Sequence, residues 1–542
     1  MFLHFLRRRL PLFSGALLIL FAGCGGEKSV SESPRAVRGS SGGTMIVGMD
    51  ADADALTPLM SSSAFAGDIA GQIFAGLAKT DPDMAGYSPW LAESWEFSND
   101  RKELTFFLRR DAYWHDGVPF TAEDVAFSVP LYKSPEIAYG SMRWLRHITE
   151  VTAVDSYTVR FRFDAVYPYQ LTDANVATPL PKHILGEVPI NEIPTHPFHR
   201  NPVGTGPFKF VKWEPQQSIE LEANESFFLG RPPLDRVVFK VVPSQTNLVT
   251  QLRTGDIDFY PKLRPEAYED LQDVDHLRKL QIPSRVYYYL GWQNASPFFS
   301  DRNVRRALTM AIDRESIVKN LVKGRGAILN TPILPFLWAH DPEVPAIPYD
   351  PEGAKKLLSE AGWADHDGDG WLDRNGTPFE FTMKTNENND LRKDIVVVVQ
   401  EMLAKLGIRM RPETMEFTVF IDQTTGKDFE SMCHGWKQGS KVDLTSIWHT
   451  QSINDRYNMV SYSNPRVDEL MDRAVTEIDR EKATKLWSEV QRLIAADAAY
   501  TFLFTLDDLY AIDDRFQNVE LTTYSWTYNM HEWSVDPARR KY

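Results

Sequence analysis

Cysteine is almost absent from this sequence of 542 residues, which contains only Cys24 and Cys433. Two cysteines cannot form a disulfide framework, so the fold must rely on a packed core. The aromatic residues that a core needs are plentiful, with 14 Trp, 20 Tyr and 31 Phe. The composition therefore excludes wholesale disorder, and the length predicts about three domains or one large intertwined body.

An excess of positive charge is also missing. The chain has 59 basic and 74 acidic residues, which gives a formal net charge of −15. A surface that binds duplex nucleic acid needs clustered Lys and Arg to neutralise phosphates. We therefore expect no nucleic-acid partner.

Motifs of common enzyme and cofactor sites are absent too. The sequence has no HExxH, no phosphate-binding loop and no dinucleotide-binding glycine pattern. Residues 39–43 formally match the nucleophile elbow of hydrolases, but they lack the preceding strand and following helix that an elbow requires. We expect no catalytic residues and no cofactor, and a secreted hydrolase stays as the alternative from another class.

Long hydrophobic runs are missing as well, because the apolar stretch from Leu10 to Ala22 is shorter than the roughly 20 residues of a membrane-spanning helix. The stretch follows three arginines and precedes Cys24, an order typical of a secretory signal. The small residues before Cys24 resemble a bacterial lipoprotein signal, in which the cysteine becomes the lipidated N-terminus. We predict a signal peptide over 1–23 and a lipid-anchored flexible tether over 24–43. An ordinary signal peptide with an incidental cysteine is the alternative.

The rest of the chain mixes strand-like and helical patterns. Short β-rich runs occur at 45–47, 105–108, 237–239 and 287–290. An apolar stripe from Val304 to Ile312 predicts a helix that Ser300 or Asp301 caps, and a second helical segment ends at Val322. Further helices are expected after the Asp-Pro and Asn-Pro pairs at 350–351 and 464–465 and over 480–496.

Alternating carboxylates mark the segment 365–373, where Asp365, Asp367 and Asp369 are spaced as in a calcium loop. Position 376 is Gly, so the distal Glu of an EF-hand is missing. Asp and Gly serve plain turns equally well. Both interpretations stay open; we favour the turn and predict no metal.

A closely spaced block of motifs follows the predicted tether: LAESWE at 91–96, LTFFLRR at 104–110 and WHDGVPFTAEDV at 114–125. This block resembles the signature of the family 5 extracellular solute-binding proteins, the peptide- and nickel-binding lipoproteins of ABC importers. Further similar motifs follow in the family's order: GTGPF at 204–208, GDID at 255–258, the segment 301–313 and NPRVD at 464–468.

The resemblance implies an α/β, two-lobed periplasmic-binding-protein fold with an extra domain inserted in lobe one. Lobe one would consist of 44–76, 200–285 and 500–542, the inserted domain of 77–199 and lobe two of 286–499. The resemblance also implies a monomer, lipid-anchored at the cell envelope and facing the periplasm or the exterior.

The implied function is to capture a solute by hinge closure and deliver it to the permease and ATPase subunits of an ABC importer. Oligopeptides are the expected ligands, and a nickel chelate, haem, a glycoside or an opine are alternatives within the family. A lipoprotein that senses peptides without transporting them is a further alternative.

In peptide-binding relatives, an Asp shortly after a Gly-Trp pair of lobe two binds the peptide's α-ammonium. Here Lys437 follows Gly435 and Trp436, and Asp443 is the next carboxylate. Either Asp443 serves this role or the ligand is not anchored by an amine. The candidate ligand-binding residues are Gly435, Trp436, Asp443, Tyr289, Trp292 and Trp448.

Overall fold

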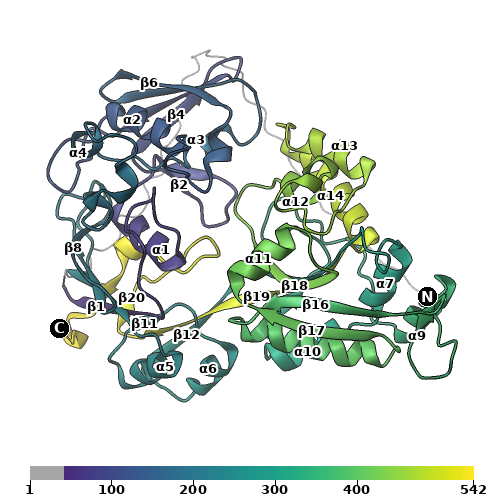
Figure 1. Ribbon diagram of the computed structural model, residues 1–542. Coiled ribbons are helices and arrows are strands. Elements are labelled where there is room, and N and C mark those ends of the chain that lie inside the picture. Colours follow the sequence, from purple (N-terminus) through teal and green to yellow (C-terminus); the bar gives the residue numbers. More distant parts are fainter. Residues whose placement is uncertain (1–41, 542) are drawn as a thin grey trace, which may run out of the picture. The chain divides into compact units, whose positions relative to one another are not determined.

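The computed structural model describes residues 42–541 of the chain (Figure 1). The predicted signal peptide, Cys24 and most of the predicted tether lie outside these residues. Gly42 and Gly43 are buried, and their backbone N–H groups donate to the Pro233 carbonyl at 2.8 Å and to the Asp235 carboxylate at 3.2 Å. These two residues therefore belong to the folded body rather than to a tether. None of the helices within 42–541 combines the length and apolarity that crossing a membrane requires.

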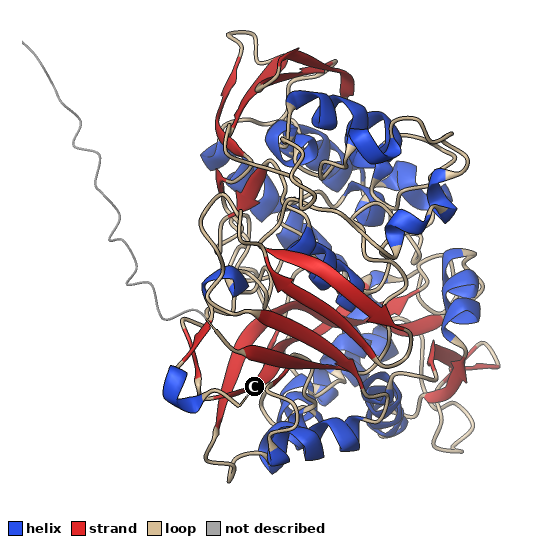
Figure 2. Ribbon diagram, turned by 90° about the vertical axis from the view of Figure 1, so that its left-hand side faces the viewer, coloured by secondary structure: helices blue, strands red, loops and turns tan. Residues whose placement is uncertain are grey.

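One mixed sheet of 11 strands runs through most of this body, in the order β17-β16-β18-β12-β19-β11-β1-β10-β9-β8, with β13 paired to β19. The strands are β1 (Thr44–Met49), β8 (Phe208–Glu214), β9 (Ser218–Ala223), β10 (Arg236–Val241), β11 (Phe259–Tyr260), β12 (Leu277–Trp292), β13 (Gly326–Ile328), β16 (Glu380–Asn386), β17 (Arg409–Met415), β18 (Ser431–Lys437) and β19 (Tyr500–Asp513). Figure 2 shows helices lying above and below the central strands.

The buried apolar side chains form separate cores along this sheet. One core combines the residues expected in lobe one and in the inserted domain. Two further cores lie in the part expected as lobe two, one with Tyr287 and Tyr289 and the other with Tyr288 and Leu290. Because neighbouring residues of a strand point to opposite faces, these two cores cover the two faces of the same strands.

The inserted segment has its own four-stranded sheet, in the order β4-β5-β7-β6. Its elements are β2 (Ala78–Thr80), β3 (Tyr87–Pro89), β4 (Ala92–Phe97), β5 (Glu103–Leu108), β6 (Ile148–Asp155), β7 (Thr158–Phe163), α2 (Ala122–Tyr132), α3 (Gln170–Ala174) and α4 (Lys182–Leu185). The chain returns through the GTGPF turn, where a Cβ on Gly204 would stand 1.9 Å from the Ile73 carbonyl oxygen. Only glycine allows this turn to approach the end of α1 (Ala64–Ile73) so closely.

The helices expected from capping signals are confirmed. Asp301, Asp350 and Asn464 each accept a backbone N–H at the start of α7 (Arg302–Met310), α9 (Pro351–Glu360) and α13 (Pro465–Ala474). The helices that follow β11 are α6 (Pro265–Asp270), α7 (Arg302–Met310), α8 (Arg314–Leu321), α9 (Pro351–Glu360), α10 (Asp390–Ala404), α11 (Phe417–Thr425), α12 (Thr445–Trp448), α13 (Pro465–Ala474) and α14 (Arg480–Asp497). In Figure 1, α10 lies along β17 and β16, which it contacts.

The return to lobe one, expected at residue 500, occurs further along β19. Tyr500 and Phe502 pack in one lobe-two core and Phe504 in the other, whereas Leu509 packs in the lobe-one core. The first half of β19 therefore belongs with lobe two, and the strand crosses near Leu506.

The carboxylates of Asp365, Asp367 and Asp369 converge, with one oxygen of each within 4.8 Å of the others. All three side chains are exposed and accept backbone N–H groups of the same turn, for example Gly368 to Asp365 at 2.7 Å. Such bonds are those of an Asx-type turn. The absence of a metal site stays a prediction.

Candidate ligand-binding cleft

Two long strands connect the lobes. In β12 and β19, Leu277 to Pro283 pair with Asp513 to Asp507, and Tyr287 to Gly291 pair with Thr505 to Tyr500. The register shifts between Pro283 and Tyr287. Arg285 therefore lies where the ladder is interrupted and the chain passes from one core to the other.

Trp436 lies near the end of β18, opposite Tyr287 of β12. Its side chain is half-buried, its indole N–H is 3.5 Å from the Tyr500 hydroxyl, and its ring meets the edge of Tyr457 at 5.8 Å. A Cβ on Gly435 would stand 3.0 Å from the Tyr287 carbonyl. The space next to Gly435 is therefore filled by the neighbouring strand of the protein itself and not left open to a ligand.

Three of the expected aromatic residues lie inside lobe two. Tyr289, Trp292 and Trp448 are each 0 % exposed. Tyr289 stacks on Tyr500 at 3.8 Å, and the indole N–H of Trp292 donates to the Thr501 hydroxyl at 3.0 Å. Trp448 packs 4.5 Å from the Tyr500 ring. Tyr289 and Trp448 belong to the core against which Trp436 packs, whereas Trp292 belongs to the core on the other face of the sheet. None of the three reaches the solvent of the cleft.

The loop after β18 contacts the inserted domain through a set of groups that we call the clasp: Lys441, Val442, Asp173, Tyr167 and Tyr169. The Lys441 ammonium donates to both oxygens of Asp173 at 3.1 Å, and these side chains are only 10 % and 1 % exposed. The Tyr167 hydroxyl donates to the same carboxylate at 2.9 Å. Tyr169 donates to the Val442 carbonyl at 2.9 Å and accepts from the Val442 N–H at 3.2 Å.

Aromatic rings complete the surroundings of the Lys441 ammonium. It lies 5.3 Å from the Tyr169 ring centre and 5.6 Å from that of Trp144, within the range of cation–π attraction. Burial raises the pKa of Asp173, and the Lys441 charge opposes this rise. The clasp thus joins lobe two to the inserted domain through a buried ion pair whose carboxylate accepts three hydrogen bonds.

A hairpin of the inserted domain makes a second contact with lobe two. Met84 lies between β2 and β3 with φ +57°, and its side chain belongs to a lobe-two core. Arg480 of α14 donates to the neighbouring Ala85 carbonyl at 3.4 Å. The inserted domain is therefore attached to lobe two at two separate points.

Asp443 follows the clasp in the same loop. It is half-buried, and it accepts the Thr445 backbone N–H at 3.1 Å. It lines a cavity of about 560 Å³ together with Trp144, Tyr167 and Tyr169. Asp443 is thus at the boundary between lobe two and the inserted domain, and its second carboxylate oxygen accepts no hydrogen bond from residues 42–541.

A second cavity, of about 340 Å³, opens on the lobe-one side. Its lining comes from α1, from the β2 strand and from the loop around 524–531, and Arg285 contributes from the crossing strand. Asp68 of α1 also lines it and accepts the Trp526 indole N–H at 2.7 Å. Burial raises the pKa of Asp68 to about 6, although Lys437, Lys262 and Arg285 act against this rise.

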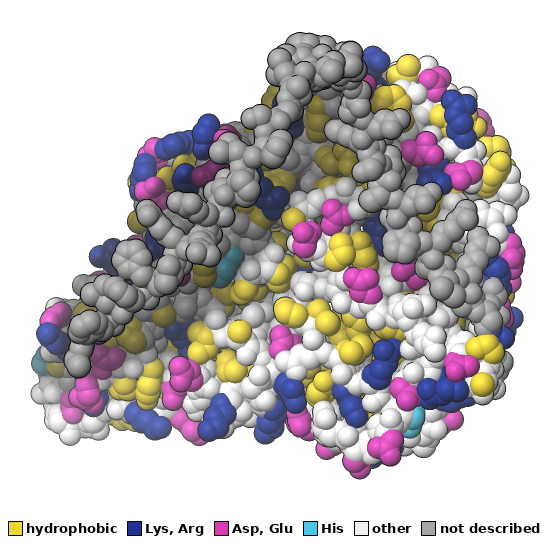
Figure 3. All heavy atoms as spheres, turned by 180° about the vertical axis from the view of Figure 1, so that it is seen from behind, with side chains coloured by type: hydrophobic (Ala, Val, Ile, Leu, Met, Phe, Trp, Pro, Cys, Tyr) yellow, Lys and Arg dark blue, Asp and Glu magenta, His cyan; other side chains and the backbone are white. Residues whose placement is uncertain are grey.

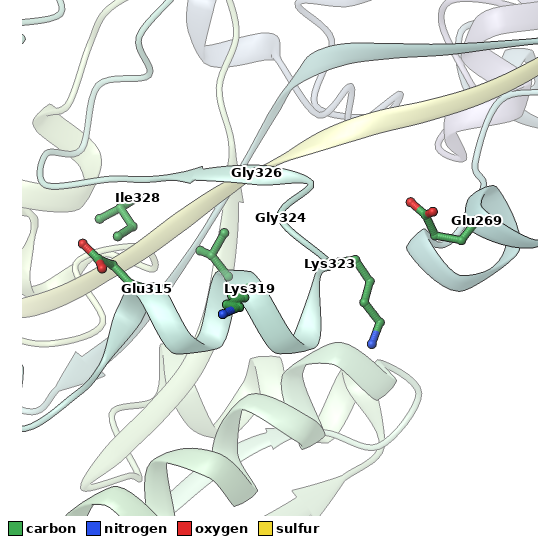
Figure 4. A pocket seen from close by; sticks show the side chains of 8 residues that line it. Glu269, Glu315, Lys319, Lys323, Gly324, Gly326 and Ile328 are labelled. Atoms are coloured by element: carbon green, nitrogen blue, oxygen red, sulfur yellow. The ribbon is translucent and has the colours of Figure 1, made fainter. Parts of the chain in front are cut away.

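Other depressions contain none of the expected residues. One, of about 660 Å³, lies at the end of α8, where Glu315, Lys319 and Lys323 point outward beside Gly324 and Gly326 (Figure 4). On the face seen in Figure 3, acidic and basic side chains alternate with small apolar patches over the visible surface. The first of these depressions brings Glu269 of lobe one beside α8 of lobe two, but neither feature contains an expected ligand-binding residue.

Sequence reasoning missed the groups that meet across the lobes. Asp173 and Lys441 are 268 residues apart, so no local pattern relates them. The available signal was the pair of lysines, Lys437 and Lys441, in the loop where peptide-binding relatives carry an acid.

Comparison with known proteins agrees with this geometry. The model of the bacterial extracellular solute-binding proteins, family 5 (middle), matches residues 86–458. The oligopeptide-binding protein AppA of Bacillus subtilis is 35% identical over 529 residues, covering 95% of this chain and 96% of the relative. Heme-binding protein A of Haemophilus influenzae is 25% identical, covering 79% and 81%.

Solved structures show the same arrangement. The structure of AppA from Bacillus subtilis with a nonapeptide has a TM-score of 0.78 at 33% identity, covering 92% of this chain and 99% of that one. NikZ from Campylobacter jejuni in complex with Ni(L-His) has a TM-score of 0.77 at 27% identity, covering 91% and 99%. The expected α/β periplasmic-binding-protein fold is confirmed.

Proposed function

Because the chain belongs to the bacterial extracellular solute-binding proteins of family 5, we propose that it captures oligopeptides between its lobes and delivers them to an ABC permease. The observation that carries this proposal is the likeness, over nearly the whole chain, to a relative whose structure holds a nonapeptide. Closure around the ligand follows from two lobes joined by β12 and β19, since a ligand that contacts both lobes stabilises the closed state. No chemical change of the ligand is involved.

Trp436 and Asp443 are the proposed ligand contacts from lobe two. Trp436 offers a half-buried apolar ring at the end of β18, and Asp443 offers a carboxylate beside the 560 Å³ cavity. Gly435, Tyr289 and Trp448 support Trp436 from behind, and Trp292 packs in the core on the other face of the sheet.

Ligand recovery tests the proposal directly. Protein purified without denaturation from its own cells is unfolded, and the released small molecules are identified by mass spectrometry. We expect peptides of varied sequence, unchanged on recovery. A thermal-shift series with a neutral nonapeptide, Ni(L-His) and haem then compares ligand classes, because a ligand of the folded state raises the melting temperature.

Stabilisation by Ni(L-His) alone would favour the second candidate function, which the likeness to NikZ supports. The variant Trp436→Ala tests whether Trp436 contacts the ligand directly or only stabilises the fold. We expect it to weaken binding of the stabilising ligand by roughly 10-fold through lost contact area, and to lower the melting temperature of the free protein modestly, because the ring also packs against Tyr457.

The lipid anchor is part of the same proposal. A signal peptide over 1–23 directs export, and acyl chains on Cys24 attach the protein to a membrane, where its permease partner resides. Cys24→Ala should release the protein into the soluble fraction, and Cys433→Ala is the matched control. Sedimentation of the Cys24 variant with membranes after a high-salt wash would contradict the anchor.

A further inference from the structure

One methionine of the inserted domain is buried by the other lobe. Met84 lies in the turn 81–86 between β2 and β3, and its neighbours Asp83 and Ala85 are exposed. Met84 itself is only 4 % exposed, and the other buried members of its core all come from 287–502. The burial of Met84 therefore depends on the contact between the inserted domain and lobe two.

The turn that presents Met84 is held within the inserted domain. The Met84 N–H donates to the Asp81 carbonyl at 2.9 Å, and the Asp81 N–H donates to the Gly86 carbonyl at 3.0 Å. Met84 has a φ of +57°, which is uncommon for a residue with a side chain and persists where surrounding contacts hold it. Because these hydrogen bonds are internal to the turn, we expect the turn to keep its shape when the lobes separate.

Lobe two provides the surface that receives this turn. Arg480 at the start of α14 donates to the Ala85 carbonyl at 3.4 Å, and its guanidinium lies 4.9 Å from the Trp338 ring centre. Trp338 packs against the same core that contains Met84. We call the turn 81–86 with its Met84 side chain the latch, because the side chain is removed from water only when lobe two lies against the inserted domain.

From this arrangement we infer that Met84 is an oxidation site that controls the latch, accessible to peroxide in the open state and protected in the closed, ligand-bound state. The thioether sulfur attacks one oxygen of hydrogen peroxide, the O–O bond breaks and an S=O bond forms. The second oxygen takes up the proton and leaves as water, so the sulfur is oxidised to a sulfoxide and the peroxide is reduced.

The sulfoxide changes the balance between the open and closed states. It is a polar group, and its burial in an apolar core without a hydrogen-bond donor is unfavourable. The oxidised protein therefore favours the open state and binds its ligand more weakly, although no ligand contact has changed. The inference rests on the proposed function, because it needs a ligand that stabilises the closed state.

Peptide mapping by mass spectrometry tests the protection. The full-length protein is treated with hydrogen peroxide in the presence and absence of a saturating neutral nonapeptide. We expect Met84 to be oxidised at least 5-fold more slowly in the complex. Met459 and Met471 are internal references, because they are buried in the same core but belong to lobe two, so the peptide should not change their oxidation. Equal rates at Met84 with and without the peptide would overturn the inference.

Titration calorimetry before and after treatment measures the effect on binding. We expect peroxide to weaken nonapeptide binding at least 5-fold in the wild-type protein. Met84→Leu keeps an apolar side chain without sulfur, so treatment should leave its affinity unchanged. Met84→Gln carries a polar group as the sulfoxide does, and it should bind at least 5-fold more weakly before any treatment. Met415→Leu is the matched control, because Met415 is a half-buried methionine of β17 beside the same core, and it should respond to peroxide as the wild type does.

Two further results would contradict the inference. A loss of affinity in treated Met84→Leu equal to that of the wild type would show that another residue is responsible. Untreated Met84→Gln that binds as tightly as the wild type would show that Met84 does not hold the closed state. If the nonapeptide fails to bind untreated wild-type protein, the proposed function is contradicted instead, and the same treatment with Ni(L-His) as the ligand tests the latch.

Discussion

The clasp and the end of β18 use the same kind of side chain in two different settings. Lys441 is almost fully buried and meets a carboxylate and a ring of aromatic groups supplied by the protein. Lys437, four positions earlier at the end of β18, is exposed and has no carboxylate within ion-pair distance among the described residues. The difference shows that a partner from another domain sets the role of a lysine: the first lysine holds lobe two to the inserted domain, and the second remains exposed.

The largest effect is expected at the clasp. Asp173→Asn leaves the Lys441 ammonium in the closed state without its counter-charge, which costs about 3 kcal/mol for a buried pair. The open state loses less, because there the ammonium is able to reach water. We expect ligand affinity to fall roughly 100-fold, with a larger open population in small-angle X-ray scattering.

Asp164→Asn is the control for this variant. Asp164 belongs to the same domain and pairs with His147 at 2.8 Å, but it is 55 % exposed. An exposed pair contributes about 0–1 kcal/mol, so its loss should leave affinity almost unchanged. Equal affinity of Asp173→Asn and wild-type protein would show that the clasp does not stabilise the closed state.

A smaller effect is expected from substitution of Asp443, the carboxylate proposed as a ligand contact. If this carboxylate binds the peptide's α-ammonium, Asp443→Asn should weaken the binding of a peptide with a free amine by about 2 kcal/mol. This loss is at the low end for a buried charge pair, because Asp443 is only half-buried. The N-acetylated peptide should bind both proteins equally. Asp455→Asn, which changes another acid lining the same cavity, is the control. Wild-type protein that binds both peptide forms with equal affinity would exclude amine anchoring at this site.

How well the sequence predicts these features depends on how far apart in the chain the interacting residues lie. Helix starts are local, and the caps at Asp301, Asp350 and Asn464 are where residue type and spacing place them. The ordered motifs also identify the family and hence the fold. Whether an aromatic residue faces the core or the cleft depends on tertiary packing, so sequence pattern gives no means to separate Trp436 from Trp448.

The two lysines illustrate the same limit. Both are visible in the segment after Trp436, but only the fold brings Asp173 to one of them and leaves the other exposed. The electrostatic role of a residue is set by partners from other elements, and these partners are far away in the sequence.

The smallest expected effect is a pH dependence of ligand binding at the 340 Å³ cavity. Asp68 lines this cavity, and burial raises the pKa of Asp68 to about 6 and that of Asp508 in the same direction. His531 lines the same cavity, but burial lowers its pKa to about 3, so it stays neutral between pH 5 and 7.5. Lowering the pH through 6 protonates Asp68 and removes one negative charge that repels an anionic ligand.

We therefore expect an N-acetylated nonapeptide with neutral side chains and a free carboxyl terminus to bind roughly 3-fold more tightly at pH 5 than at pH 7.5, the effect of one screened charge, whereas the C-amide of the same peptide changes little. Asp68→Asn should give the tighter binding already at pH 7.5, and any remaining pH dependence would then report Asp508. The raised pKa of Asp68 also affects the stability of the fold. The folded protein binds the Asp68 proton more tightly than the unfolded chain does. The contribution of Asp68 to the free energy of unfolding therefore falls as pH rises from about 4 through 6. If Asp68→Asn instead weakens the binding of a peptide with a free amine, Asp68 rather than Asp443 binds the ligand's ammonium.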